Sequence, residues 1–424
     1  GEIACDHYRR YREDVGLMAD IGLQAYRFSV SWPRILPEGT GTVNTRGLDF
    51  YSRLVDELLQ HGITPWVTLF HWDYPYALYC RGGWLNRESA GWFADYAALI
   101  VDKLSDRVAH WLTLNEPQCF IGMGHLDGTH APGLQMGVAE VLLAAHHALL
   151  AHGQAVQVIR ARAQTHPRIS AAPAIRVSIP DTDTPEDIEA AHNHMFSIHE
   201  QGFFNNTWFS DPMILGSYPE DGLTLYEANM PAVQDGDLAT INQPLDFFGA
   251  NIYSGRYVHA TPDGGVEKAM DRDQPLTAMG WPITPEALYW APRFFHERYH
   301  LPIVITENGM AHDDCINDGS VDDQPRIEFL QSYLQHYARA IAEGIPAQGY
   351  FLWSVMDNFE WAEGYSKRFG LIHVDYASQR RTMKASAQWY GQVIAAHGGN
   401  LIPLTGQGRA SKSAPGSYGH QQDR

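Results

Sequence analysis

Short apolar runs alternate along the chain with segments of helical periodicity. Seven runs rich in β-branched and aromatic residues predict strands, at 25–32, 64–70, 110–116, 168–175, 246–253, 302–307 and 349–357. Between them, apolar residues recur every three or four positions and predict helices, for example over 47–61, 138–160 and 325–342. Strands and helices that alternate in this way are typical of a parallel sheet covered by helices.

The predicted fold class is α/β, a (β/α)8 TIM barrel whose first strand is missing. Polar and aromatic residues gather where the predicted strands end, which is where such barrels hold their active sites. A closed barrel of this type has eight strands, whereas the sequence supplies seven, and the stretch 6–21 ahead of them has the pattern of a helix. We expect one domain over residues 1–400. Residues 401–424, rich in Gly, Ser, Gln and Arg towards their end, predict a disordered tail.

The amino-acid composition indicates which partners and which cellular compartment the protein favours. The chain has 424 residues, 45% of them hydrophobic, which is enough for a large core. Its 30 basic and 49 acidic residues give a net charge of −19 without an acidic block, which disfavours nucleic acid and anionic membranes and favours neutral substrates. Four widely spaced cysteines indicate neither a disulfide scaffold nor a zinc site and favour a cytoplasmic location. No membrane-spanning run or signal peptide is visible, and a homo-oligomer is compatible with the sequence.

Two glutamates end apolar, strand-like runs far apart in the sequence. Glu116 ends the run 111–116, and Glu307 ends the run 303–307. A carboxyl group gains nothing at the end of a buried strand unless it has a task there. A retaining glycosidase needs two such groups roughly 5 Å apart on either side of one glycosidic bond. The pair therefore predicts glycoside hydrolysis.

The surroundings of the two glutamates are similar to the signatures of glycoside hydrolase family 1. The signatures are Thr-Leu-Asn-Glu-Pro at 113–117 and Ile-Thr-Glu-Asn-Gly at 305–309. The likeness extends over 4–396 and includes motifs at 26–29, 70–73, 130–133, 278–281 and 356–365. The resemblance implies a barrel enzyme that hydrolyses β-linked glucosides and related sugars with retention, without metal or organic cofactor.

The resemblance also implies roles for the residues around the reaction centre. Glu116 matches the general acid/base and Glu307 the nucleophile, while Arg27 and Tyr253 match the residues that support the nucleophile. The negative charge of Glu307 should raise the pKa of Glu116 and keep it protonated. Once Glu307 is esterified by the sugar, that charge is gone, and Glu116 becomes more acidic and acts as a base toward water.

A second set of residues resembles the family's sugar-binding positions: His71, Trp72, Asn115, Asn251, Trp281, Trp353, Glu360 and Trp361. By the resemblance Asn115 contacts the 2-hydroxyl, Glu360 and Trp361 contact O4 and O6, Trp353 forms the floor, and Trp281 stands at the entrance. A carboxylate at the O4/O6 corner would repel a 6-phosphate, so unphosphorylated sugars are expected. Neutral β-glucosides and cello-oligosaccharides are the expected substrates, with glucose, galactose and fucose left open.

The missing first strand leaves an alternative function open. In the family that strand carries a glutamine that binds the 3- and 4-hydroxyls, and no residue here matches it. The alternative is therefore a weakly active or inactive member that serves as a sugar-binding scaffold. The histidine clusters at 146–152 and 192–199 lack the spacing of a metal-binding helix, and no metal site is expected. Cys119 is expected to line the leaving-group side as a small apolar residue.

Overall fold

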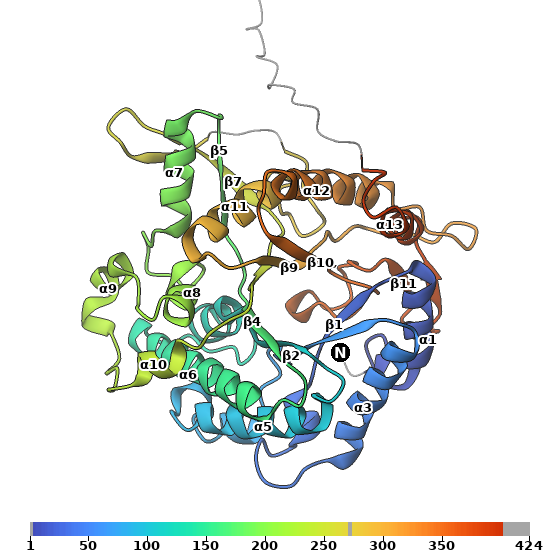
Figure 1. Cartoon of the computed structure of the whole chain (residues 1–424), viewed down its shortest axis with the longest axis horizontal. Helices are drawn as coiled ribbons and strands as arrows, with labels where there is room; N and C mark the ends of the chain where they lie inside the picture. Colours follow the sequence, from blue (N-terminus) through green and yellow to red (C-terminus); the bar gives the residue numbers. More distant parts are fainter. Residues whose placement is uncertain (1–2, 270–273, 402–424) are drawn as a thin grey trace, which may run out of the picture.

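The computed structural model describes residues 3–269 and 274–401. Four strands form one parallel sheet in the order β1 (Ala25–Ser29), β2 (Thr64–Phe70), β3 (His110–Asn115) and β4 (Arg168–Ala172). Three others form a second parallel sheet in the order β10 (Ala347–Leu352), β9 (Ile303–Asn308) and β6 (Phe248–Asn251). Figure 1 shows both groups of strands at the centre of the molecule.

Backbone hydrogen bonds between β4 and β6 join the two sheets into one curved wall. The amide of Asp246 donates to Ile169 O at 2.9 Å, and the amide of Asn251 donates to Pro173 O at 3.0 Å. The amide of Ile175 then donates back to Asn251 O at 3.0 Å. The seven predicted strands are therefore the strands of a single parallel α/β barrel, and the predicted fold class is confirmed.

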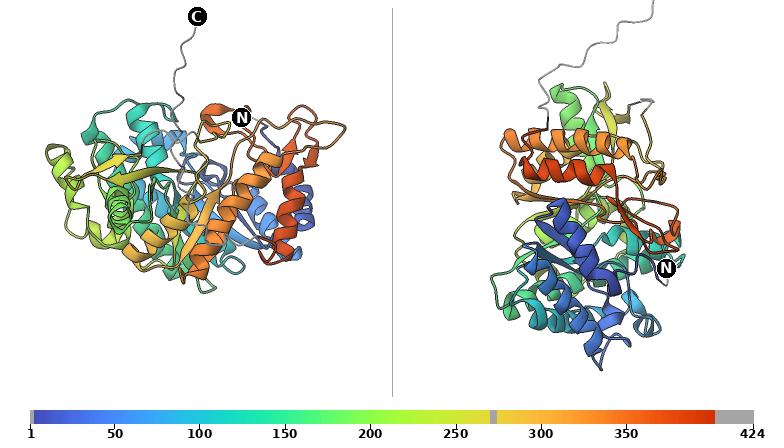
Figure 2. Two further views of the ribbon diagram at one scale, coloured as in Figure 1. Left: turned by 90° about the horizontal axis from the view of Figure 1, so that it is seen from above. Right: turned by 90° about the vertical axis from the view of Figure 1, so that its right-hand side faces the viewer.

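Helices surround this wall of strands. The long ones are α1 (His7–Ile21), α3 (Thr45–Gln60), α5 (Ser89–Leu104), α6 (Val138–Arg162), α11 (Ala287–Tyr299), α12 (Gln324–Ala342) and α13 (Ala385–Ala395). In Figure 1, α5 and α6 lie on one side of the strands and α11, α12 and α13 on the opposite side, and Figure 2 shows the same arrangement from two further directions. Within the described ranges, no helix is both long enough and apolar enough to cross a membrane.

Further elements occupy the connections. Their helices are α2 (Trp32–Ile35), α4 (Tyr76–Tyr79), α7 (Pro185–Phe196), α8 (Thr207–Ile214), α9 (Glu220–Tyr226) and α10 (Asp237–Ile241). Gln118–Asp127, labelled η2, is a π-helical segment that directly follows the Glu116 motif. Two small sheets lie outside the barrel: β5 (Val177–Pro180), β7 (Gly255–Ala260) and β8 (Val266–Lys268) form one, and β11 (Ile372–Val374) and β12 (Arg381–Met383) form the other.

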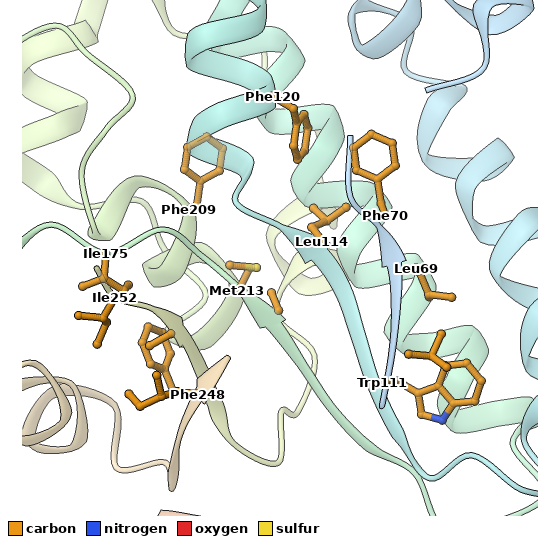
Figure 3. Close-up of a cluster of buried hydrophobic side chains, with 14 of the residues drawn as sticks. Leu69, Phe70, Trp111, Leu114, Phe120, Ile175, Phe209, Met213, Phe248 and Ile252 are labelled. Atoms are coloured by element: carbon orange, nitrogen blue, oxygen red, sulfur yellow. The ribbon is translucent and has the colours of Figure 1, made fainter. Parts of the chain in front are cut away.

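Apolar side chains of the strands fix the barrel against its helices. Figure 3 shows Phe70 of β2, Leu114 of β3 and Phe120 of η2 converging in one buried cluster. The rings of Phe70 and Phe120 meet edge to face with centroids 5.0 Å apart, an arrangement that aromatic pairs favour. This packing holds the backbone on both sides of Glu116, which lies between Leu114 and Phe120 in the sequence.

The barrel is open between β10 and β1. Among the described residues, no backbone hydrogen bond joins these two strands, and a cavity of about 290 Å³ lies between them, lined also by Cys5 and His7. Phe28 is the single fully buried residue of β1, and β10 has none, whereas all six residues of β9 are buried. The outer layer continues across this opening, because α1 contacts both α3 and α13. The first strand, which the sequence predicts to be missing, thus leaves a slot between β10 and β1 in the inner layer of the barrel.

Because β1 and β10 each pair on one side only, we expect their amides to exchange with solvent faster than those of β3 and β9. The free edges leave backbone groups without ladder partners, so these strands open at a lower free-energy cost. Hydrogen–deuterium exchange, followed by mass spectrometry of peptides that cover the four strands, measures the difference. Equal protection in all four strands would contradict the prediction.

Several predicted element boundaries differ from the structure. The run 25–32 is a strand only to Ser29, because Trp32 begins helix α2, with Pro33 in its first turn, where proline is favoured. The runs 168–175, 246–253 and 349–357 also end as strands several residues early, where the backbone becomes irregular around the active site. The two small sheets were not predicted. Of the predicted tail, residues 402–424 lie outside the described residues.

Candidate active site

The two predicted catalytic glutamates lie at the C-terminal mouth of the barrel. Glu116 directly follows β3, and Glu307 is the fifth residue of β9. Both side chains line one open cavity of about 1030 Å³. They are nevertheless largely removed from solvent, with only 8% and 4% of Glu116 and Glu307 exposed. A polar pair that is buried and faces a cavity is typical of a reaction centre.

Glu307 receives a hydrogen bond on each carboxyl oxygen. Arg27 Nη1 donates to Oε1 at 2.7 Å, and the hydroxyl of Tyr253 donates to Oε2 at 2.7 Å. The ion pair with Arg27 is nearly dry, because 6% of the arginine side chain and 5% of the glutamate side chain are exposed. Burial and the charge of Glu307 hold the pKa of Tyr253 well above its usual value, so the phenol stays a donor. These contacts stabilise the ionised form of Glu307, as its predicted role as nucleophile requires.

Glu116 lies in the opposite electrostatic environment. Burial, and then the negative charge of Glu307, raise the pKa of Glu116 to about 8. The amide of Asn251 donates to its Oε1 at 2.9 Å and the thiol of Cys119 donates to its Oε2 at 3.3 Å, and both contacts oppose the rise. Glu116 therefore holds a proton at neutral pH. The two glutamates thus have different surroundings: two donors bind Glu307, whereas burial and the neighbouring charge favour the protonated form of Glu116.

The backbone at the site adopts conformations that non-glycine residues rarely take. Glu116, Trp72 and Trp361 have φ values of 44°, 84° and 40°, in the left-handed region. Surrounding hydrogen bonds hold two of them: the amide of Glu116 donates to Ala172 O at 2.8 Å, and Trp72 Nε1 donates to Asn115 O at 2.9 Å. Conformations of this kind cost of order 1–3 kcal/mol each and cluster at functional sites.

Asn115 connects the two halves of the site. Its Oδ1 accepts hydrogen bonds from Arg27 and, at 3.2 Å, from Asn251, which in turn bind Glu307 and Glu116. Because Arg27 can only donate, the amide nitrogen of Asn115 must face His71 Nε2, 3.2 Å away. Burial and the charge of Arg27 lower the pKa of His71 to about 3, so its ring is neutral and its Nδ1 carries the proton.

Aromatic rings form the other walls of the cavity. The ring of Trp353 stacks on His71 with centroids 5.6 Å apart, and that of Trp361 stacks on Trp72 at 4.7 Å in a tilted arrangement. Trp281 lies 5.0 Å from Tyr253 and lines the cavity with the other three tryptophans. Rings that face a cavity in this way provide apolar surfaces for the C–H faces of a pyranose.

Glu360 adds a third carboxyl group to the cavity. Burial and the charge of Glu307 raise the pKa of Glu360 to about 7. Near neutral pH it therefore exists in both forms, and it can accept hydrogen bonds from sugar hydroxyls or donate one. It lies on the loop between β10 and β11, beside Trp361.

A buried network of ion pairs supports the loop that carries Glu360. Lys384 Nζ donates to Asp357 Oδ1 at 2.8 Å and also bonds Asp314. Arg368 Nη1 donates to Asp357 Oδ2 at 2.6 Å, and Arg326 Nη2 donates to Asp314 Oδ2 at 2.8 Å. Lys384, Asp357 and Asp314 have no exposed side-chain surface. The network therefore ties the loop that carries Glu360 to helices α12 and α13.

Replacing Lys384 by methionine is expected to lower the free energy of unfolding by about 3 kcal/mol or more. Without it, the buried carboxylates of Asp314, Asp323 and Asp357 share only the guanidinium groups of Arg326 and Arg368, so one negative charge is uncompensated. Chemical denaturation followed by circular dichroism measures the loss. Lys103→Met is the matched control, since its pair with Asp49 is partly exposed and contributes only about 0–1 kcal/mol. Equal stability of the two variants would contradict the role given to Lys384.

The structure brings all the predicted site residues together around one reaction centre. They are Glu116, Glu307, Arg27, Tyr253, His71, Trp72, Asn115, Asn251, Trp281, Trp353, Glu360 and Trp361. Their individual roles stay predictions. Sequence reasoning missed the contacts of Asn251 and Cys119 with Glu116, and the interpretation of Cys119 as a merely apolar residue is wrong, because its thiol donates to the carboxyl group.

The histidines of the two clusters have other partners. His146 is hydrogen-bonded to the hydroxyl of Tyr218 and to Asp237, each at 2.8 Å, and His152 to Thr113 at 2.6 Å. In the ranges that the structure describes, no three His, Cys, Asp or Glu side chains are arranged to hold a metal ion.

A parallel α/β barrel with two buried carboxyl groups at its C-terminal mouth defines the carboxylate-pair class of glycoside hydrolases. The sequence profile of glycosyl hydrolase family 1 matches residues 1–399, and the chain belongs to this family. The family predicted from the sequence is thereby confirmed.

Relatives and solved structures agree with this assignment. The chain is 45% identical over 401 residues to β-glucosidase A of Thermotoga maritima, covering 94% of this chain and 88% of the relative. It is 41% identical over 423 residues to the bifunctional β-D-glucosidase/β-D-fucosidase of Bifidobacterium breve, covering 94% and 89%. The β-glucosidase from Thermotoga maritima in complex with castanospermine superposes with a TM-score of 0.85 at 45% identity, covering 94% of this chain and 88% of that one.

Proposed function

We propose that the chain is a retaining β-D-glucosidase that removes terminal glucosyl residues from short neutral β-glucosides, including cello-oligosaccharides. The observation that carries the proposal is the pair formed by Glu116 and Glu307, in which one carboxyl group is held protonated and the other is bound by two donors. Relatives named β-glucosidase and 1,4-β-D-glucan glucohydrolase support the substrate class.

The first step of the proposed mechanism forms a glycosyl ester. A carboxylate oxygen of Glu307 attacks the anomeric carbon of the bound sugar while the bond from that carbon to the glycosidic oxygen breaks. Glu116 gives its proton to the departing oxygen, so the aglycone leaves as a neutral alcohol or phenol. Configuration at the anomeric carbon inverts, and the negative charge moves from Glu307 to Glu116.

The second step releases the sugar. Esterification removes the charge of Glu307, which had raised the pKa of Glu116, so Glu116 remains ionised and can accept a proton from water. The water oxygen attacks the anomeric carbon as the ester bond breaks, and Glu116 recovers its proton. A second inversion restores the β configuration, and both carboxyl groups return to their starting states.

The carboxyl groups of the cavity support unphosphorylated sugars as substrates. The cavity carries three carboxyl groups near the reaction centre, those of Glu116, Glu307 and Glu360. A sugar phosphate brings two negative charges and would be repelled there. A relative named as both a β-D-glucosidase and a β-D-fucosidase supports tolerance of a sugar that lacks the 6-hydroxyl and carries an axial 4-hydroxyl, which we include in the proposal.

The proposal is tested by following the hydrolysis of p-nitrophenyl β-D-glucoside with proton NMR. We expect β-D-glucose to appear first and α-D-glucose only later, by mutarotation. If α-D-glucose appears first, the retaining mechanism is wrong. If folded protein binds glucose but releases no p-nitrophenol, the chain is the sugar-binding scaffold that the slot between β10 and β1 leaves as the alternative.

The pH dependence of the reaction should follow the proton of Glu116. We expect kcat/KM to fall as the pH rises through about 8, because the ionised acid can no longer protonate the leaving group. In Cys119→Ala a donor to the carboxylate is lost, so the ionised form is less stable and the fall should move to higher pH. A pH–rate profile of both proteins measures the shift. A fall that stays in place or moves to lower pH would contradict the role of the thiol.

A further inference from the structure

One wall of the active-site cavity is basic, although the chain carries a net charge of −19. The cavity-lining residues on this wall include Arg176, His194, His199, Arg256 and Lys268. Among the described lining residues of segments 174–206 and 251–268, Glu200 is the single carboxylate. The three carboxyl groups of the reaction centre, by contrast, all lie at the barrel mouth.

This basic wall lies on the side of the cavity where the leaving group must be. The amide of Glu116 donates to Ala172 O, and Gln118, two residues further on, donates to Ala174 O at 3.1 Å and to Asn205 O at 3.3 Å. The wall thus continues directly from the backbone that holds Glu116. Because Glu116 is the group that protonates the departing oxygen, the aglycone lies beside it.

Strand register places the cationic residues on one face of the small sheet β5–β7–β8. Arg256 pairs with Ser178, and two residues further along β7 Val258 pairs with Lys268. Alternate residues of a strand share a face, so Arg256, Ser178 and Lys268 point to the same side. All three line the cavity, which identifies that side as the one facing the substrate.

The remaining basic side chains of the wall meet at the same place. His194 is hydrogen-bonded to the hydroxyl of Ser178 at 2.8 Å, and its ring lies 5.4 Å from that of His199. Arg176 donates to Phe204 O at 2.9 Å and contacts Glu200 at 3.4 Å, an exposed pair that leaves part of the guanidinium open to solvent. Burial lowers the pKa of His194, and the charges of His199, Arg176, Lys268 and Arg256 lower it further, so these side chains share one electrostatic environment.

We propose that this wall is a subsite for an anionic aglycone, so that the enzyme favours β-glucosides whose leaving group carries a carboxylate. The inference rests on the proposed function and adds a substrate class to it. Guanidinium groups bind carboxylates in a bidentate, charge-assisted geometry, and a cluster of like charges along a cleft also attracts the substrate before it binds. Glucosides of hydroxybenzoic acids and of aldonic acids have this chemistry.

The test compares 4-carboxyphenyl β-D-glucoside with its neutral methyl ester. We expect kcat/KM for the acid, relative to the ester, to fall about 1.5- to 5-fold in Arg256→Met and in Lys268→Met, as for the loss of a partly exposed charge–charge contact. Comparing this ratio between the variants and the unsubstituted chain cancels the different reactivities of the two leaving groups. In the unsubstituted chain the ratio should also decrease with added sodium chloride, because salt screens exposed charges.

Arg12→Met is the matched control, because Arg12 is an exposed arginine on α1 that pairs with Glu57 and does not line the cavity. It should leave the acid-to-ester ratio unchanged. If the ratio is the same in Arg256→Met, Lys268→Met and the unsubstituted chain, the anionic subsite is refuted while the glucosidase assignment stands. If no glucoside is hydrolysed, the proposed function fails instead, and calorimetric affinities of the acid and the ester for the folded proteins decide on the subsite.

Discussion

Replacing Glu307 by alanine is expected to lower kcat for p-nitrophenyl β-D-glucoside by about 10⁵-fold or more, in line with a loss of about 10⁶ for removal of a covalent nucleophile in another hydrolase. Glu307 is the buried carboxylate to which Arg27 and Tyr253 both donate at 2.7 Å. Without it, no ester forms, and the positive charge of Arg27 faces the developing cation of the transition state. Release of p-nitrophenol under saturating substrate measures the loss.

Added azide distinguishes a lost nucleophile from a damaged fold. The small anion can enter the space left by the carboxylate and attack the same face of the sugar, while Glu116 still protonates the leaving group. Glu307→Ala should therefore recover activity with azide and yield α-glucosyl azide, the inverted product. Glu297→Ala, an exposed glutamate on α11, is the control and should retain full activity. Substantial residual activity of Glu307→Ala without azide would contradict the assignment.

The barrel could be predicted from the sequence because most of its strands, β1 and β10 excepted, are buried on both faces. In the run 303–307, three consecutive apolar β-branched residues precede Thr306 and Glu307, and the run stands out against the periodic helices around it. The small sheet β5–β7–β8 was missed for the opposite reason: Arg256 and Lys268 interrupt its strands with exposed charges. The excess length of the predicted strands has a similar origin, since apolar residues continue past Ser29 and Leu352 while the backbone bends around the site.

The residues of the site could be predicted from the sequence, but the hydrogen bonds between them could not. Motifs identified Glu116 and Glu307, because a glutamate at the end of an apolar strand is unusual and the two contexts match known signatures. The contact between Asn251 and Glu116 joins residues 135 positions apart, and no local pattern encodes it. The sequence predicted a protonated Glu116 from the charge of Glu307, but it did not predict that burial is the larger cause of the raised pKa.

The slot between β10 and β1 shows how far a barrel can depart from closure. The interior still aligns Arg27 of β1 with Glu307 of β9, although β10, the strand between β9 and the opening, does not pair with β1. The contact between Arg27 and Glu307 therefore joins β1 to the second sheet across the interior. Thr68 Oγ1 and Arg27 Nε border this cavity as buried polar atoms for which the described residues offer no partner. Such atoms are costly to bury, so the slot lowers stability.

Replacing Glu116 by alanine is expected to slow the two chemical steps differently, depending on the leaving group. For cellobiose, whose glucose leaving group needs a proton, kcat/KM should fall by about 10³- to 10⁴-fold, the upper part of the range for general acid catalysis. For 2,4-dinitrophenyl β-D-glucoside, whose phenolate leaves unaided, formation of the ester should be little affected. Stopped-flow absorbance of dinitrophenolate and glucose release from cellobiose measure the two cases.

The second step gives a further signature of Glu116. Without a base, water attacks the glycosyl ester slowly, so dinitrophenolate should appear in a burst equal to the enzyme concentration, followed by a slow steady state. Azide needs no base and should accelerate the steady state, giving β-glucosyl azide, because the ester on Glu307 keeps the opposite face of the sugar covered. If Glu116→Ala lowers kcat/KM equally for cellobiose and for the dinitrophenyl glucoside, and shows no burst, Glu116 contributes to the structure of the site and not to the chemical steps. Glu116, whose pKa is raised to about 8 by burial and by the charge of Glu307, would then take no part in the reaction.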